Sequence, residues 1–320
     1  MEEVKLSKFD KAIGYVFRGF DLITQPVRKY SEKKVSEGVK KKSDGYEMEG
    51  HVHGIYSDGY YTPKKILQFC RERDIEIVAI SEHDTLEHWN SCRKAEEKFP
   101  DVLNIPSVEI TSRDGDIIAY FDSYDRKNLK SVRKLVENRN LRATEVINAV
   151  HRAGGVAIAA HPNKSRGLSS REIIALSNRL DGYEKINIES GSYESGLLEK
   201  ETKIASLGSS DSHAVTIGAA VTKIRPEVYE RCLIDGVLDK DLARKTVIEC
   251  IRGERDRKEK GLEPNMTPLR IIESGLEQNA SKLTYINPAA CILKLVEYFD
   301  DSSKTIAKKL EKILDDVKLF

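Results

Sequence analysis

The stretch HVHGIYSDG (residues 51–59) closes a strand candidate, Glu47–His53, and guides the interpretation of the rest of the chain. Residues i and i+2 of a strand point to the same face, so the imidazoles of His51 and His53 can both approach one ion. Asp58 follows in a Ser-Asp-Gly turn, which can fold its carboxylate back over the same strand end. The stretch therefore predicts a strand that ends in metal-binding side chains.

Further apolar strand candidates follow this one, and helix-like segments lie between several of them. The strand candidates are Ile75–Ser81, Leu103–Ile110, Asp116–Phe121, Gly155–Ala160, Gly182–Glu189 and Ile204–Ser209. The helical segments are Lys64–Arg73, Glu87–Lys98, Leu141–Ala153 and Ser169–Arg179. Strands that alternate with helices favour parallel pairing and an α/β fold. Reactive residues at the carboxyl ends of the strands favour a barrel over an open sheet.

The two ends of the chain lack this strand pattern. Residues 1–45 are lysine-rich and are interpreted as a helical N-terminal extension with a linker, and residues 46–224 as the barrel. Residues 225–320 are interpreted as a C-terminal helical region, with helices expected at Val228–Leu238 and Leu242–Arg252. The chain is thus expected to be one barrel with helices added on both sides.

Composition narrows the class of protein. The 320 residues carry a formal net charge of +1, which argues against general electrostatic binding of nucleic acid. The five cysteines are dispersed without a CxxC pair, which is typical of reduced thiols in the cytoplasm. The apolar stretches are too short to span a bilayer, and the amino terminus lacks the apolar core of a secretory signal. We therefore expect a cytoplasmic protein without membrane association, and its oligomeric state is left open.

Histidines and carboxylates gather where the strand candidates end. Five of the seven histidines lie at strand ends or in the turns that follow: His51, His53, His83, His161 and His213. Glu109 ends the strand candidate LNIPSVEI, and Asp211 precedes His213 at the i, i+2 spacing. Imidazole and carboxylate ligands that meet at one barrel mouth are suited to several divalent metal ions.

Five motifs together resemble one known family. HVHGIYSDG, SEHDT, VEITSRDGDIIAYF, GGVAIAAHP and GSSDSHA followed by IGAA are similar, in order and approximate spacing, to the polymerase and histidinol phosphatase (PHP) family. The resemblance covers about residues 47–224. It implies a distorted seven-stranded β/α (TIM-like) barrel that holds two or three Mn, Fe, Zn or Mg ions and hydrolyses phosphoesters.

The resemblance also implies three ligand sets that share one carboxylate. The first set is His51, His53, Glu109 and Asp211; in the second, Glu109 bridges to an ion that His161 also binds; the third is Asp58, His83 and His213.

One position of the second set departs from the family, which usually supplies a histidine from the strand after Glu109. Asp116 stands there in this chain. As a ligand, a carboxylate would favour Mn or Mg over Zn; alternatively, the second ion site is weak or empty. Lys164 and Arg166 follow His161 and are candidates for holding the substrate phosphate, although they can equally be solvated loop charges. Arg113 is a weaker candidate for the same role.

The expected activity is hydrolysis of a small phosphomonoester, a nucleotide being one candidate, by a metal-activated hydroxide. One alternative is a nuclease that trims short RNA or DNA, for which stacking aromatics near the mouth would be needed. Tyr56, Tyr60 and Tyr61 form the one aromatic cluster of that kind in the sequence. Another alternative is a catalytically weak metal-binding barrel with a regulatory or assembly role.

Overall fold

The structure is a computed structural model, and it describes residues 45–124, 132–138, 140–193, 196–214, 216–255 and 262–266. The expected N-terminal extension and the expected helices beyond residue 266 lie outside these ranges. None of the helices in the described part of the chain combines the length and the apolar character that crossing a bilayer requires.

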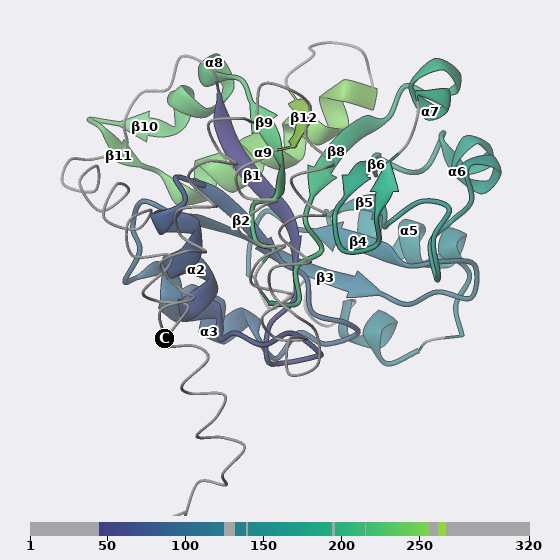
Figure 1. Cartoon of the computed structure of the whole chain (residues 1–320), viewed down its shortest axis with the longest axis horizontal. Coiled ribbons are helices and arrows are strands. Elements are labelled where there is room, and N and C mark those ends of the chain that lie inside the picture. The colour runs from purple at the N-terminus through teal and green to yellow at the C-terminus, as the bar shows by residue number, and fades with distance from the viewer. Residues whose placement is uncertain are drawn as a thin grey trace, which may run out of the picture. The chain divides into compact units, whose positions relative to one another are not determined.

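All the strand segments that the sequence predicts form strands of a nearly closed barrel (Figure 1). They are β1 (Tyr46–Val52), β2 (Ile77–Ile80), β3 (Leu103–Ile110), β4 (Ile117–Tyr120), β5 (Val156–Ala159), β6 (Gly182–Asn187) and β8 (Ala205–Ser209). The sheet runs from β1 through β2, β3, β4 and β5 to β6, and β8 pairs with β6. At the gap, Val52 and Ser212 form an isolated parallel bridge, which brings the chain after β8 against the end of β1.

The strand β4 distorts the barrel, because it pairs antiparallel with both β3 and β5. The alternation of strands and helices favoured parallel pairing, which does not hold for β4. The six residues from Thr111 to Asp116 that separate β3 from β4 are too few for a crossover helix, so the chain turns straight back. As a result Asp116, which precedes β4, lies at the same end of the barrel as the carboxyl ends of β3 and β5.

The chain beyond residue 219 adds strands as well as helices. The strand β9 (Ala220–Ile224) pairs antiparallel with β1, and β12 (Leu262–Met266) pairs antiparallel with β9. The helix expected at Val228–Leu238 was wrong. That segment holds the end of α8 (Pro226–Tyr229), a 3-10 turn (Glu230–Cys232), and the hairpin of β10 (Leu233–Ile234) and β11 (Val237–Leu238). Asp235 and Gly236 both have positive φ, as a tight two-residue hairpin turn requires.

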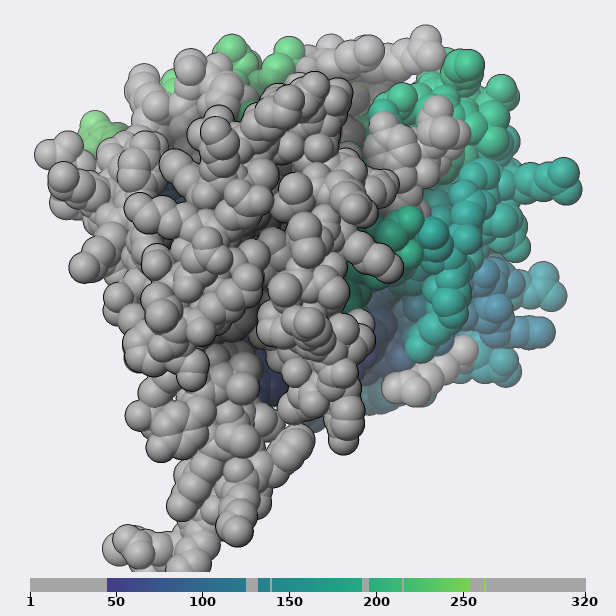
Figure 2. All heavy atoms as spheres, viewed as in Figure 1, coloured from purple at the N-terminus to yellow at the C-terminus, as the bar shows by residue number. Residues whose placement is uncertain are grey.

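Helices cover the outside of the barrel. These are α2 (Pro63–Glu72), α3 (Trp89–Glu96), α5 (Ala143–Arg152), α6 (Ser170–Leu176) and α7 (Leu197–Glu201), and a short strand β7 (Ser192–Tyr193) precedes α7. In Figure 1, α2 and α3 lie on one side and α5 to α7 on the other, and Figure 2 shows the teal segments around α6 at the molecular surface. Two of these helices begin at caps that the sequence supplies: Thr62 accepts from the Lys65 amide, and Ser169 from the Glu172 amide.

The helix α9 (Lys240–Arg255) packs at the end of the barrel where β1 begins. Val247 and Ile251 of α9 belong to the same buried apolar cluster as Tyr46 and Met48 of β1. His51 stands at the opposite end of β1. The apolar cluster therefore fills the amino-terminal end of the barrel and leaves the carboxyl-terminal mouth for polar side chains.

Candidate metal centre

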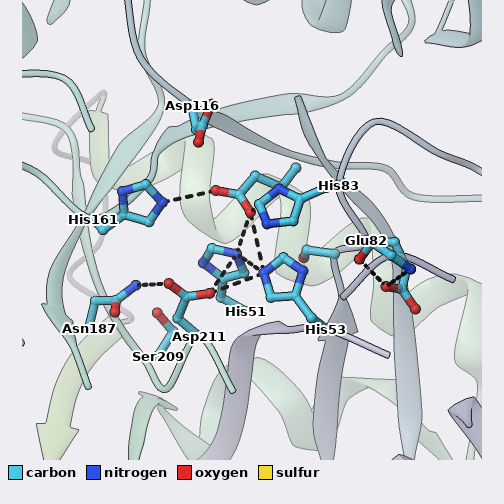
Figure 3. A network of polar contacts seen from close by, with 12 residues as sticks. His51, His53, Glu82, His83, Asp116, His161, Asn187, Ser209 and Asp211 are labelled. Carbon is cyan, nitrogen blue, oxygen red and sulfur yellow. Dashed lines mark hydrogen bonds and ion pairs between the residues drawn. The ribbon is translucent and has the colours of Figure 1, made fainter. Parts of the chain in front are cut away.

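The barrel mouth gathers all the residues that the sequence singled out as candidate metal ligands. Figure 3 labels His51, His53, His83, Asp116, His161 and Asp211 of this set. Their donor atoms form three groups, and the atoms of each group lie within 4.8 Å of one another. The first donor group is His51, His53, Glu109 and Asp211; the second is Glu109, Asp116 and His161; the third is His53, Asp58, His83 and His213. Glu109 belongs to two groups and His53 to two, so the three groups form one continuous centre.

The first donor group is compact and buried. The Nε2 atoms of His51 and His53 lie 2.9 Å apart. Glu109 Oε2 lies 3.1 Å from His51 Nε2 and 3.3 Å from His53 Nε2, and Asp211 Oδ1 lies 3.3 and 3.1 Å from the same two nitrogens. Ligands of a tetrahedral ion with bonds of about 2.1 Å would be about 3.4 Å apart. The spacing of these four atoms is therefore that of a first coordination sphere.

The pKa values of the first donor group, without an ion, also indicate a site for positive charge. Burial acts against charge on His53, but hydrogen bonds to Asp211 and Glu109 outweigh it and raise the pKa of His53 to about 9. Burial disfavours the Asp211 carboxylate, but the nearby His51 and His53 outweigh it and lower the pKa of Asp211 to about 2. Without an ion, protons on the imidazoles balance the carboxylates.

The third donor group lies at the rim of the mouth. Asp58 Oδ2 is 3.5 Å from His83 Nε2 and 3.4 Å from His213 Nε2, and Asp58 Oδ1 is 3.6 Å from His53 Nδ1. The Asp58 side chain is 54% exposed, whereas His53 is buried. The group therefore reaches from the buried centre to solvent, which leaves room for a ligand from outside.

The second donor group has a different environment. His161 Nε2 lies 3.0 Å from Glu109 Oε1, so the two oxygens of Glu109 face different groups. The buried carboxylate of Asp116 is held by Arg166, with Nε 3.0 Å from Oδ2 and Nη2 3.4 Å from Oδ1. Burial and the charge of Glu109 raise the pKa of Asp116 to about 6, against the opposing effect of Arg166. Asp116 is thus near the centre, but it already has a cationic partner.

The basic residues expected to hold phosphate separate into two kinds. Arg166 lies at the mouth through its ion pair with Asp116, and its side chain is 55% exposed. Lys164 and Arg113 are also exposed, but among the described residues their side chains form no hydrogen bond or ion pair with the three donor groups. Arg166 alone of the three is therefore built into the centre.

A buried carboxylate that the sequence did not single out supports the first two groups. Glu184, in β6, accepts from His51 Nδ1 at 2.9 Å and from the His161 backbone amide at 2.7 Å. It also accepts from Asn187 Nδ2 at 2.8 Å, and Asn187 Nδ2 lies 3.2 Å from Asp211 Oδ2. In the neutral ring, a proton held on Nδ1 of His51 by Glu184 would leave the Nε2 lone pair toward the centre. The available signal was an acidic residue inside an otherwise buried strand.

Two more carboxylates fix the backbone around the ligands. Glu49 accepts from the amides of Ser210 and Gly218, at 3.0 and 2.7 Å, and so ties β1 to the segment that carries Asp211. Glu82 accepts from the amides of Tyr56 and Ser57, at 3.3 and 3.1 Å, and so holds the turn before Asp58. Neither Glu49 nor Glu82 belongs to the three donor groups.

His88 follows SEHDT in a helix-like segment, where the sequence favours a surface position, and this was wrong. Its side chain is fully buried, and Nε2 lies 2.9 Å from the Ile80 carbonyl and 3.1 Å from the Ser107 carbonyl. Burial lowers the pKa of His88 to about 4, so the ring is neutral. His88 therefore ties the start of α3 to β2 and β3 and is no part of the three donor groups.

The backbone is strained at two of the candidate ligands. Asp211 has a φ of 56° and His161 a φ of 28°, both in the left-handed region that residues with a side chain rarely adopt. Such strain persists where the surrounding structure imposes it, and it is common at functional sites. Here the hydrogen bonds of Glu49 and Glu184 hold these two segments in place.

The residues present fit divalent metal ions at the first and third groups. Imidazole and carboxylate donors suit Mn, Fe, Zn and Mg to different degrees. His53 Nδ1 and His83 Nδ1 are buried ring nitrogens that make no hydrogen bond among the described residues, although Asp58 Oδ1 lies 3.6 Å from the first and Glu109 Oε2 lies 3.1 Å from the second. Unpaired buried nitrogens are rare in proteins, and a metal ion is one of the groups that explains them.

No family model matches the chain. An uncharacterized protein of Methanocaldococcus jannaschii is 30% identical over 123 residues, which are 35% of this chain and 65% of that protein. The chain thus spans slightly less than two thirds of that relative's length.

Two solved structures share the architecture. One is a two-domain protein from Bacteroides vulgatus containing a predicted PHP-like metal-dependent phosphoesterase, with a TM-score of 0.51 and 16% identity, over 72% of this chain and 69% of that one. The other is PsfC from Pseudomonas syringae, with a TM-score of 0.50 and 15% identity, over 74% of this chain and 99% of that one. The fold thus agrees with the resemblance that the motifs carry: the chain has the fold of a PHP-like metal-dependent phosphoesterase.

Proposed function

We propose that this protein is a metal-dependent phosphoesterase that hydrolyses a small phosphomonoester. The observation that carries the proposal is the first donor group, which joins four buried donor atoms from three parts of the barrel. The two imidazole nitrogens lie 2.9 Å apart, and each lies 3.1–3.3 Å from a carboxylate oxygen of Glu109 and of Asp211. His51, His53, Glu109 and Asp211 would hold one divalent ion, and Asp58, His83 and His213 another. Such ions supply Lewis acidity, which activates water and neutralises the charge of a phosphoryl group.

The protein's own side chains organise the site. Glu184 keeps the proton of His51 on Nδ1, so that Nε2 faces the centre as an acceptor. Glu109 stands between the groups and presents Oε2 to the first group and Oε1 to His161. Arg166 places a guanidinium at the rim, where its exposed donors can bind phosphoryl oxygens of a substrate. No nucleophilic serine or cysteine is required for this chemistry.

A small substrate is favoured by how the ligand residues are placed. His51 and Glu109 have fully buried side chains, so the first ion would lie at the bottom of the mouth. Asp58 and His213 are partly exposed and would hold an ion at the rim. A terminal phosphoryl group can reach both positions, and two divalent ions and one guanidinium would attract its negative charges.

The test combines metal analysis with a substrate panel. The purified full chain is loaded separately with Mn, Fe, Zn and Mg and assayed against p-nitrophenyl phosphate, nucleoside monophosphates, sugar phosphates, bis(p-nitrophenyl) phosphate and short oligonucleotides. Phosphate release from monoesters that a chelator abolishes is the expected result. Cleavage of oligonucleotides or the diester alone would replace this proposal with the nuclease. No turnover with any ion would point to the regulatory role instead.

A further inference from the structure

The loop that follows β5 is built around Asp116. In this loop, the backbone carbonyl of Arg166 accepts from the Asp116 amide at 2.7 Å. The Arg166 side chain forms an ion pair with the Asp116 carboxylate. Arg166 Nη2 also donates to Thr111 Oγ1 at 2.5 Å, at the start of the turn that leads to Asp116. Arg166 is therefore fastened to both ends of the segment that presents the carboxylate.

The local backbone allows little freedom for another arrangement. Arg166 has a φ of 63°, and a Cβ at Gly167 would lie 2.1 Å from the His161 carbonyl oxygen. A Cβ at Gly115, just before Asp116, would lie 2.7 Å from the Leu168 amide. The two segments thus pack backbone to backbone. This packing fixes where the arginine side chain leaves the loop and directs it toward Asp116.

We propose that Arg166 takes the place of a metal ion at the second donor group, so that the protein holds two ions rather than three. The inference rests on the proposed function only in taking the first and third donor groups as ion sites. Both oxygens of Asp116 face the guanidinium, which is a planar, permanently charged group that matches a carboxylate in two-point contact. Without Asp116, the second group keeps only His161 and one oxygen of Glu109.

Charge favours the guanidinium over a third ion. A divalent cation at the second group would lie close to the fixed charge of Arg166 and would share Glu109 with a cation in the first group. Arginine does not lose its proton in this environment, so it cannot make way as a histidine can. The ion pair therefore supplies one permanent positive charge where a metal would supply a removable one.

The test titrates Mn²⁺ into the metal-free full chain and counts bound ions by mass spectrometry and electron paramagnetic resonance, with no substrate present. The native protein is expected to bind two ions per chain. Arg166→Ala is expected to gain a third, bound at least about tenfold more tightly than any third ion of the native protein. Arg166→Lys keeps the charge and should still bind two. Lys164→Ala removes an exposed charge from the same loop and is the matched control, with no expected change.

Three results would overturn the inference: three ions in the native protein, an Arg166→Ala variant that still binds two, or an Asp116→Ala variant that loses one. A further variant, Asp116→Ala, should keep two ions, and loss of one would identify Asp116 as a metal ligand. If Arg166→Ala fails to fold, Arg166→Gln is measured against Arg166→Lys for the same gain. These counts are independent of turnover. Absence of phosphatase activity together with the expected counts would reject the proposed function and leave this inference standing.

Discussion

The first and second donor groups share Glu109, yet they differ in what their carboxylates contact. In the first group, Asp211 Oδ1 faces only imidazole nitrogens, at 3.1 and 3.3 Å. In the second, Asp116 faces the guanidinium of Arg166, at 3.0 and 3.4 Å. Both carboxylates are buried and both stand at the barrel mouth. A position at the barrel mouth therefore does not by itself make a carboxylate a metal ligand. The cationic group nearest to the carboxylate also matters.

The supporting residues repeat this contrast. The first group is held by acceptors behind its ligands, such as Glu184 behind His51, which orient the rings without occupying the centre. In the second group, the partner of Asp116 is Arg166, which lies at the mouth itself. The two arrangements predict opposite responses to mutation, which the following experiments use.

The largest expected difference is between Asp211→Ala and Asp116→Ala. Asp211→Ala should lose one bound ion and at least about a thousandfold in kcat/KM for a phosphomonoester, because it removes a ligand of the ion that activates water. Asp116→Ala should keep both ions and lose less than about tenfold. Metal content and steady-state kinetics are measured on both.

The fold of each variant is checked by circular dichroism, and Asp211→Asn is the conservative control for volume. Neither residue belongs to the apolar core, so both variants should fold. Equal losses from the two alanine variants would remove the distinction between the groups.

The next effect is the pH dependence of ion binding. Because the pKa of His53 is raised to about 9 in the ion-free site, the ring carries a proton at neutral pH that an ion must displace. The pKa of His51 is also raised well above its usual value, by Asp211 and Glu109 against burial, so affinity for the first ion should rise at least about tenfold per pH unit between pH 7 and 9. Calorimetry in two buffers of different ionisation enthalpy measures the proton released per ion. Binding that releases no proton at pH 7.5 would contradict the assignment of His53.

The same experiment separates the two groups. Arg166 does not titrate in this range, so raising the pH should strengthen the first site without opening the second. The number of ions bound per chain is expected to stay constant between pH 7 and 9 while the affinity changes. A third ion that appears at high pH would show that a proton, and not the guanidinium, keeps the second group empty.

Removing the support behind the first group should have a smaller effect. Glu184→Gln keeps the volume but replaces the acceptor for His51 Nδ1 with an amide, which holds the ring less firmly. Affinity for the first ion should fall about 10- to 100-fold, as is usual when the partner of a metal-binding histidine is removed. Affinity for the rim ion, at the third donor group, should be nearly unaffected. The nitrogen chemical shifts of His51 would report a changed tautomer, which a merely structural role for Glu184 would leave as it is.

The sequence predicted much of the fold because the strands are short, apolar and separated by helical segments. It missed the direction of β4, although the six-residue spacing from β3 already indicated a hairpin. It missed β12, whose sequence LEPNM has no alternation of apolar and polar residues and contains a proline. It also assigned a helix to the β10–β11 hairpin, where the apolar spacing outweighed the Asp235-Gly236 turn signal.

The ligand candidates were predictable because each stands at the end of a strand or in the next turn, and the structure brings them together at one mouth. Their roles as ligands remain a prediction. The partners of these residues were less predictable. Glu184 lies 133 residues from His51, and Arg166 lies 50 residues from Asp116. Such contacts depend on the register of the barrel and on the positive φ of Arg166 in the loop after β5. No local pattern in the sequence encodes either of them.

The smallest expected effect concerns the rim. Glu82 accepts from the Ser57 amide at 3.1 Å and from Ser57 Oγ at 2.5 Å, so it holds the turn that carries Asp58 without touching the first group. Glu82→Gln weakens these charge-assisted hydrogen bonds but keeps an acceptor in place. Affinity for the rim ion should fall by less than about tenfold, because Asp58, His83 and His213 all remain.

Affinity for the buried ion should not change, since His51 and Asp211 contact other supports. Stepwise Mn²⁺ titration separates the two ions, with Glu87→Gln, an exposed carboxylate five residues along the chain, as the matched control. If both ions weaken equally, Glu82 acts on the whole mouth. The first and third donor groups would then act as one cooperative site, and the second group would differ from that joined site as a whole.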